Sequence, residues 1–240
     1  PPRSTLFPYT TLFRSSQMRY FQVEKGPGTV RYRGRRTYAL STFVTISGVQ
    51  GPQPNELYIW MPFPAQSASQ TGIKNLGRSV EAIFPDYRGL SLYRLADRAA
   101  GTQIHTSQDY LVQVYGVESE VDSDLVRNPP DPLQAVYVLF TGQATLVPAG
   151  AKEIAALAKK TVGKEKNPYL QARMLLDALT GMMTWSSSAI GTDPLQALGS
   201  GKADSWDMAI LYVALLRAAG IPANPVAGIV VDDSRQSWNH

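Results

Sequence analysis

The fold is decided by one stretch near the end of the chain, Gly201-Lys-Ala-Asp-Ser-Trp-Asp-Met-Ala-Ile-Leu-Tyr-Val-Ala-Leu-Leu-Arg-Ala-Ala-Gly-Ile-Pro222. Asp204 suits the N-cap of a helix, and Asp207 adds negative charge to the first turn of that helix. Between residues 208 and 219 the only charged side chain is that of Arg217. A helix that is apolar on nearly every side is buried, so we expect this one to lie inside a core.

Both ends of this helix carry clear signals. Gly220 suits the left-handed position that follows a helix, and Pro222 prevents the helix from continuing. At the other end, Ser205 and Trp206 fall in the first turn, where the helix dipole is positive. A hydroxyl in that position has the geometry of a nucleophile, and the rest of the sequence must show whether it does any chemistry.

The composition is that of a globular protein. The chain has 240 residues, of which 44% are hydrophobic and 18% charged, enough for one large or two ordinary domains with real cores. No apolar run approaches the roughly 18 residues that a membrane span needs. A net charge of +4 does not imply a nucleic-acid partner without a focused basic surface. The chain has no cysteine, which excludes disulfides, thiolate metal sites and a cysteine nucleophile, but says nothing of its compartment.

Residues 1–15 resemble the in-frame translation of a widely used sequencing-adapter oligonucleotide, as in a reading frame from assembled environmental reads. We therefore expect a disordered leader that is an artefact. The true N-terminus, with any signal peptide, is then missing, and His240 is equally a possible truncation point.

Residues 16–145 read as a β-domain. Its expected strands are residues 37–46, 57–61, 79–84, 90–95, 110–116 and 135–140, and residues 121–132 form a loop between two of them. Short strands separated by turn signals indicate an antiparallel β-sandwich of immunoglobulin-like type.

Two features of this β-domain could be binding sites. Arg31, Arg33, Arg35 and Arg36 could meet a phosphate or an anionic lipid, but a charged, solvated strand edge explains them better. His105 has no second histidine or carboxylate at ligand spacing, so we expect a strand role rather than a metal site.

Residues 146–240 change to a helical period. We expect helices over residues 152–162 and 169–185, the second entered through Asn167-Pro168, and a short helix from Pro194 to about residue 198. After the decisive stretch, residues 226–231 and 236–240 read as strands.

Three features of this second part belong together: Ser205-Trp-Asp-Met-Ala209, then Leu215-Leu-Arg-Ala-Ala-Gly-Ile-Pro-Ala223, then His240. They resemble the core of the transglutaminase-like superfamily, which has the papain-like α+β fold. In that family a cysteine opens a buried helix, the helix ends in Arg-Ala-x-Gly-Ile-Pro-Ala, and a histidine follows on a nearby strand. Bacterial members often carry a β-sandwich before this core and are frequently extracytoplasmic.

The resemblance implies roles for four residues. Ser205 falls at the position of the family's nucleophilic cysteine, and His240 at that of the general base. The third, acidic member would lie beyond His240, so the core is expected to be incomplete at its C-terminus. Trp238, on the same strand-like run, and Trp206, beside the nucleophile, are candidates for substrate binding, although Trp206 would equally suit a role in capping the core. The family implies an amide of a peptide or glutamine side chain as substrate, and no cofactor or metal.

Serine in place of cysteine leaves three interpretations. The protein is a pseudoenzyme that keeps the cleft and binds peptide or amide side chains. Alternatively, it is a working serine variant that transfers acyl groups or hydrolyses amides, or a non-catalytic structural module. A read error is a further explanation, because one base separates serine from cysteine codons. The oligomeric state cannot be inferred from the sequence.

Overall fold

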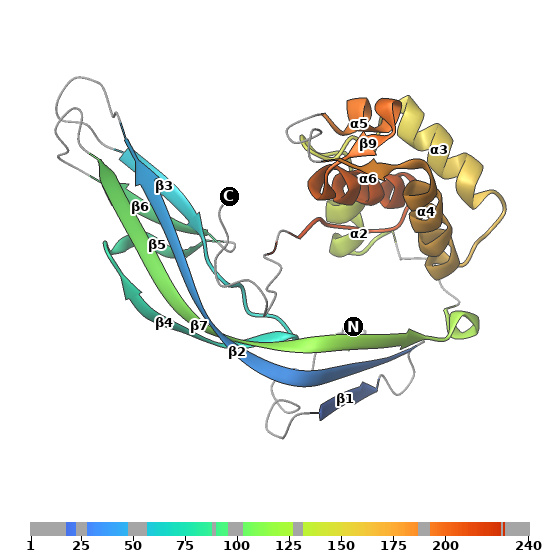
Figure 1. The fold of residues 1–240 in the computed structure, drawn as a ribbon. Coiled ribbons are helices and arrows are strands. Elements are labelled where there is room, and N and C mark those ends of the chain that lie inside the picture. Colours follow the sequence, from blue (N-terminus) through green and yellow to red (C-terminus); the bar gives the residue numbers. More distant parts are fainter. Residues whose placement is uncertain are drawn as a thin grey trace. The chain divides into compact units, whose positions relative to one another are not determined.

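The computed structural model describes residues 18–22, 28–47, 57–87, 90–95, 103–126, 132–186, 193–226 and 228 (Figure 1). The chain divides into two units, Pro1–Val121 and Asp122–His240. Residues 122–145, which the sequence predicts to be part of the β-domain, group with the second unit. The expected leader, residues 1–15, lies outside the described residues.

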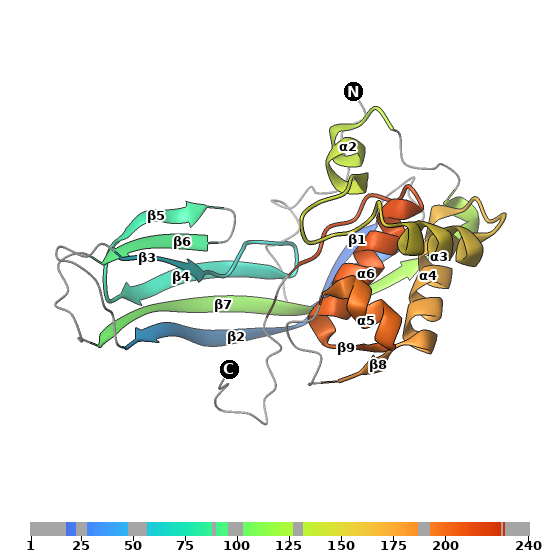
Figure 2. The same cartoon turned by 90° about the horizontal axis from the view of Figure 1, so that it is seen from above.

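The first unit consists of two antiparallel sheets (Figure 2). One has the order β1 (Met18–Gln22), β2 (Gly28–Ile46), β7 (Ile104–Val121) and β4 (Gln70–Arg78). The other has the order β3 (Leu57–Pro62), β6 (Leu90–Leu95) and β5 (Ala82–Tyr87). The expected strands at 37–46, 57–61, 90–95 and 110–116 are present. Of the one expected at 79–84, only residues 82–84 are in a strand, β5, because residues 79–80 form the bend that follows β4.

The two sheets share one apolar cluster because their strands alternate between inward and outward residues. Its buried members are Ile59, Met61, Tyr93, Leu95 and Ile104. Val44 and Ile46 of β2 pack against them, which brings residues of both sheets together. An immunoglobulin-like sandwich is not confirmed for this unit, and the finding is the coarser one of two small antiparallel sheets around a shared cluster.

A buried polar network also joins the two sheets. The hydroxyls of Tyr93 and Tyr110 both donate to Gln108 Oε1, at 2.6 and 3.1 Å, and Gln108 Nε2 donates to the carbonyl oxygen of Pro62 at 2.6 Å. Tyr93 and Gln108 are fully buried. Burial raises the pKa of Tyr93 above its ordinary value, so its hydroxyl stays protonated and can donate.

The second unit is mainly helical. Its elements are a 3-10 turn (Ser123–Leu125), α2 (Ala135–Thr141), α3 (Lys152–Val162), α4 (Pro168–Met182), β8 (Thr184–Trp185), α5 (Pro194–Ser200), β9 (Lys202–Ala203) and α6 (Ser205–Ala218). None of the described helices is long and apolar enough to cross a membrane.

The strand expected at residues 135–140 is wrong, because this segment forms the helix α2. Its β-branched and aromatic residues favour a strand, but tertiary contacts override that preference. In the helical form, Phe140 offers its carbonyl oxygen to the backbone N–H of Ala223 at 2.9 Å, just after α6.

Helices α4 and α5 begin where their capping residues predict. Asn167 Oδ1 accepts from the backbone N–H groups of Tyr169 and Leu170, at 3.0 and 3.3 Å, at the start of α4. Asp193 Oδ1 accepts from the N–H of Leu195 at 2.8 Å at the start of α5. The end of α4 comes earlier than expected, since Thr184–Trp185 forms the short strand β8.

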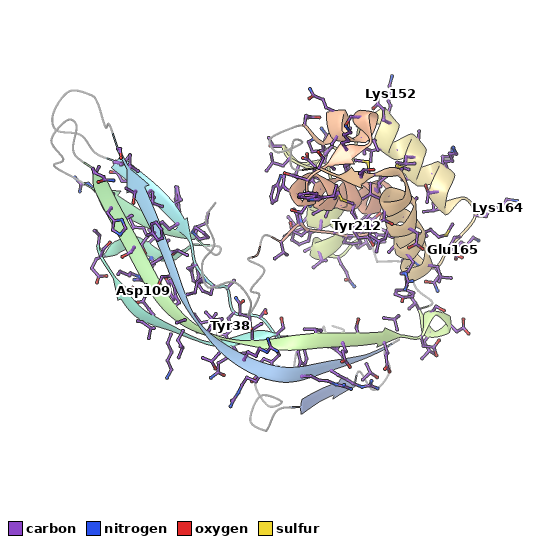
Figure 3. The ribbon with its side chains drawn as sticks, viewed as in Figure 1. Tyr38, Asp109, Lys152, Lys164, Glu165 and Tyr212 are labelled. Atoms are coloured by element: carbon purple, nitrogen blue, oxygen red, sulfur yellow. The ribbon has the colours of Figure 1, made fainter. Side chains whose placement is uncertain are left out.

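One side-chain hydrogen bond joins α6 to α4. The hydroxyl of Tyr212, labelled in Figure 3, donates to the carbonyl oxygen of Ala172 at 3.1 Å. Burial raises the pKa of Tyr212 above its ordinary value, so the hydroxyl stays protonated and remains a donor. Helix α4 is therefore held to α6 by a polar contact as well as by apolar packing.

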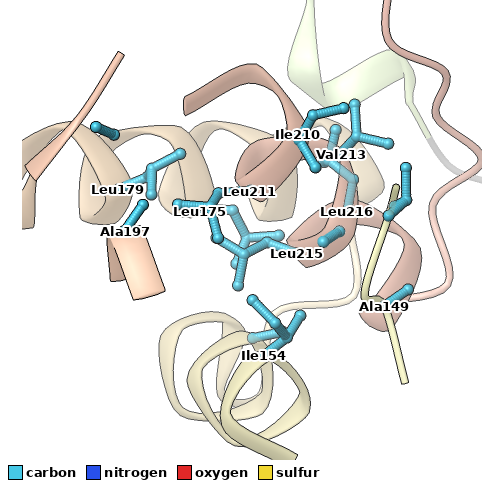
Figure 4. Close-up of a cluster of buried hydrophobic side chains, with 14 of the residues drawn as sticks. Ala149, Ile154, Leu175, Leu179, Ala197, Ile210, Leu211, Val213, Leu215 and Leu216 are labelled. Carbon is cyan, nitrogen blue, oxygen red and sulfur yellow. The ribbon is translucent and has the colours of Figure 1, made fainter. Parts of the chain in front are cut away.

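Helix α6 is the centre of this unit, as its sequence predicts. Eight of its 14 residues are buried, and Ile210, Leu211, Ala214 and Leu215 are at most 1% exposed. Figure 4 shows Ile210, Leu211 and Leu215 among side chains of the surrounding helices, which include Ile154 of α3, Leu175 and Leu179 of α4 and Ala197 of α5. Each fully buried leucine or isoleucine contributes about 1.5–3 kcal/mol of burial free energy. Of the strand expected at 226–231, Val226 and Gly228 are in no strand, and the other residues lie outside the described ones.

We predict that Gln108→Leu strongly weakens the first unit, because two buried hydroxyls then lose their acceptor at about 1–3 kcal/mol each. Tyr93→Phe is the matched control: it removes one donor and leaves Tyr110 on Gln108, so we expect a loss of about 0.5–1.5 kcal/mol. Native-state hydrogen exchange of the β6 and β7 amides measures both. Equal losses of protection in the two variants would contradict the network.

Candidate active site at the start of α6

A short, tightly bonded connection fixes the start of α6. Helix α5 ends at Gly201, which has φ +68° and donates its N–H to the carbonyl oxygen of Ala197. Strand β9 follows at once and pairs in parallel with β8: the N–H of Thr184 donates to Gly201 O at 2.8 Å, and that of Ser186 to Ala203 O at 2.9 Å. Only Asp204 separates β9 from α6, so the first turn of α6 has little freedom to move.

Asp204 is the N-cap of α6, as predicted. Its Oδ1 accepts from the backbone N–H of Asp207 at 2.7 Å. Asp207 itself is 2% exposed and lies in the first turn. Carboxylates at this end of a helix interact favourably with the positive end of the dipole. Asp204 is therefore explained by helix capping rather than by acid catalysis.

Ser205 is the first residue of α6, and its side chain is exposed although most of the helix is buried. Its hydroxyl makes no hydrogen bond to any described residue. The first N–H groups of a helix have no acceptor within that helix, and among the described residues those of Ser205 and Trp206 have none elsewhere. The site therefore presents a hydroxyl beside two backbone donors, an arrangement that can hold a developing oxyanion.

Comparison with known protein families decides the assignment. Residues 155–240 match the model of the transglutaminase-like superfamily. They form a transglutaminase-like domain. A search of curated proteins found no match. The chain is also similar to the crystal structure of a candidate cysteine protease from Cytophaga hutchinsonii, with a TM-score of 0.60 and 18% sequence identity over 80% of this chain and 67% of the other. At that identity the likeness shows the fold, which is papain-like.

The other predicted members of the site, Trp238 and His240, lie outside the described residues of the transglutaminase-like domain. The chain has two histidines, and the one other than His240 is His105, which belongs to the first unit. His105 is exposed on β7, where its Nδ1 lies 3.0 Å from Thr45 Oγ1 and its ring stacks on Phe43. Across the described residues there is no group of three or more potential metal ligands. His240 is therefore the only imidazole in this unit that could serve Ser205.

Two exposed tryptophans belong to the elements that form this end of the domain. Trp206 is 44% exposed and follows Ser205 directly. Trp185 is 64% exposed and pairs with Ala203, two residues before Ser205. The sequence alone places Trp185 inside the predicted helix 169–185. It gives no local signal that Trp185 lies near Ser205, because the β8–β9 pairing joins residues that are distant in the chain. Exposure of Trp206 argues against a role in capping the core.

The arginine run lies on β2 in the first unit. Strand β2 pairs with β7 and, over residues 29–33, with β1, so our interpretation of an edge is wrong for Arg31 and Arg33, whereas Arg35 and Arg36 lie beyond the residues that pair with β1. Arg31 makes a bidentate contact with Glu120 of β7 at 2.6 and 3.0 Å, and Arg33 lies 3.2 Å from Glu118. These cross-strand ion pairs account for Arg31 and Arg33 without an anionic ligand.

We predict that Asp204→Ala costs about 1 kcal/mol of the stability of the second unit, since the first turn of α6 loses its cap. Asp204→Asn keeps an acceptor oxygen and should stay close to the original protein. Urea denaturation followed by α-helical circular dichroism measures the difference. A loss as large in Asp204→Asn as in Asp204→Ala would show that the charge matters rather than the hydrogen bond.

Proposed function

We propose that the transglutaminase-like domain binds peptide or glutamine-side-chain amides at the start of α6, with Ser205 in the nucleophile's position, and turns them over slowly or not at all. The observation that carries this proposal is the placement of an exposed Ser205 on the first residue of a helix that is mostly buried, within the matched region. An acyl-transfer site needs an accessible nucleophile beside fixed backbone donors, and this end of α6 offers both.

The expected weakness follows from the chemistry of serine. A cysteine thiol, with an ordinary pKa of about 8.5, ionises readily beside an imidazolium or a helix N-terminus. A serine hydroxyl does not ionise there and needs an oriented base at the moment of attack. His240 is the one imidazole in this unit that could supply that base. Simple replacement of cysteine by serine in a site built for a thiolate therefore removes most of the rate.

The surroundings favour a peptide-like ligand. Trp185 and Trp206 offer apolar area with an indole N–H donor, which suits an amide flanked by carbon chains. The similar structure from Cytophaga hutchinsonii bears the name of a candidate cysteine protease, and that name agrees with chemistry at amide bonds. The proposed function requires no cofactor and no particular oligomeric state.

A working serine variant is the second candidate, and the unengaged hydroxyl of Ser205 favours it. A fluorophosphonate probe tests it directly. The proposal of slow or absent turnover predicts no labelling of the folded protein beyond that of Ser205→Ala. Labelling that Ser205→Ala abolishes would establish the active serine instead.

We predict that Ser205→Cys gains thiol-dependent amine incorporation or peptide hydrolysis, at least about tenfold above the original protein, because the thiolate needs no proton transfer at attack. Ser205→Ala is the control and should have the same background rate as the original protein. Fluorescent-amine transfer to a glutamine peptide and cleavage of a mixed peptide library measure the gain. A correctly folded Ser205→Cys protein with no gain in either assay would count against an acyl-transfer site.

A further inference from the structure

Strand β2 has a long edge that no described strand covers. On one side β2 pairs with β7 up to Ile46, and on the other side β1 pairs with residues 29–33 only (Figure 1). A bulge that contains Gly34, at φ +58°, follows the stretch that β1 covers. Beyond this bulge, none of the described residues pairs with residues 37–46 on the side of β1. We call residues 37–46 the open edge.

The open edge has none of the features that normally protect an exposed strand. It includes no charged residue and no proline, and it is rich in β-branched and aromatic residues. An edge of this kind presents a row of backbone donors and acceptors that another strand can bind. Its outward side chains are all exposed: Thr37, Ala39, Ser41, Phe43 and Thr45.

The other described edges of this unit are protected. Pairing of β4 with β7 is irregular at two places, and β4 carries the exposed Lys74. Pairing of β5 with β6 is also irregular at two places, and β5 contains Pro85. Strands β1 and β3 are only five and six residues long, and β7 carries Glu118 and Glu120 beyond the residues that pair with β4. Bulges, charges, prolines and short strands all hinder pairing with another chain, so the open edge differs from the rest of the unit.

We propose that the open edge binds the open edge of a second copy of this chain, antiparallel and about a two-fold axis at Ser41. Such an axis places each residue of one copy opposite a fixed residue of the other. On the outer face, Thr37 then lies opposite Thr45, and two threonines are a favourable cross-strand pair. Ala39 lies opposite Phe43, which is 66% exposed, and the small alanine leaves room for the ring.

Charge also favours a second copy in this register. The charged residue of β2 next to the open edge, Arg36, comes opposite Ile46 of the other copy. The Arg36 residues of the two copies then lie about 34 Å apart along the strands, which is several times the Debye length of about 8 Å. No two like charges therefore face each other, although the two surfaces are identical. Registers with the axis nearer to Arg36 would draw the arginines together and leave more of the open edge unpaired.

The pairing ends with two copies, because each copy uses its open edge once and the two-fold contact is closed. Backbone hydrogen bonds and the covering of Phe43 stabilise the pair, and the loss of translational and rotational freedom opposes it. One strand edge is narrow compared with a standard interface, which buries about 800 Å² on each partner. We therefore expect a reversible dimer whose population rises with protein concentration.

Sedimentation velocity of the full chain tests this dimer. The mean mass should rise from that of a monomer to that of a dimer with concentration. Ser41→Lys places two ammonium groups opposite each other at the axis and should raise the dissociation constant at least about tenfold. Gln113→Lys is the matched control: it adds the same charge on β7, which lies between β2 and β4, and should leave the equilibrium unchanged. A monomer at every concentration, oligomers larger than a dimer, or equal dimerisation of Ser41→Lys and the original protein would overturn the proposal.

Single cysteines test the register, because the chain contains no cysteine of its own. Ser41→Cys brings two thiols together at the axis, where opposite Cα atoms about 4.5–5.5 Å apart suit a disulfide. In Thr37→Cys and Thr45→Cys each thiol faces a threonine, so under the same oxidant we expect disulfide-linked dimers of Ser41→Cys alone. The combined Thr37→Cys and Thr45→Cys variant should regain them. Equal cross-linking of the three single variants, or none of Ser41→Cys, would overturn the pairing, and this nearly isosteric variant decides even if Ser41→Lys does not fold.

Discussion

The second unit depends on the burial of α6. A helix with one charged side chain among its last eleven residues must be enclosed, and α3, α4 and α5 each supply apolar side chains to do so. The core cluster accordingly has α6 at its centre, and the full burial of Ile210, Leu211 and Leu215 ties the surrounding helices to it. Enclosure of the sides leaves the two ends of α6 as the places where polar chemistry can occur.

The backbone groups that lack a partner within the helix are treated differently at the two ends of α6. At the C-terminal end, the left-handed Gly220 and the buried Arg217 close the turn, and the guanidinium takes up carbonyl oxygens of the following segments. At the N-terminal end, Asp204 caps one N–H group, and those of Ser205 and Trp206 have no described acceptor. A completely capped helix end would have no backbone donors available for a ligand, whereas this end retains two donors next to an exposed hydroxyl.

The sequence predicts those features that depend on neighbours in the chain. Helix α3 has the predicted bounds, and the caps of α4 and α6 are where Asn167 and Asp204 indicate. Features set by distant contacts were missed. Strand β4 has irregular pairing around Gly72 and no clean alternation, and α2 is a helix against its local preference. The position of Ser205 at the start of a helix could be predicted from the preceding cap, Asp204. The position of Trp185, which pairs with Ala203 two residues before Ser205, could not be predicted, because no local sequence pattern reveals the β8–β9 pairing.

The charges around the start of α6 bear on why serine is tolerated there. Asp204 and Asp207 lie one residue before and two residues after Ser205, and carboxylates in the first turn offset the positive potential of the helix end. A resting thiolate between them would be disfavoured unless an imidazolium compensates it. A serine is neutral at rest and makes no such demand. This end of α6 is thus compatible with a neutral hydroxyl, and any anion formed there needs stabilisation beyond that of the helix dipole, which the two backbone donors can supply.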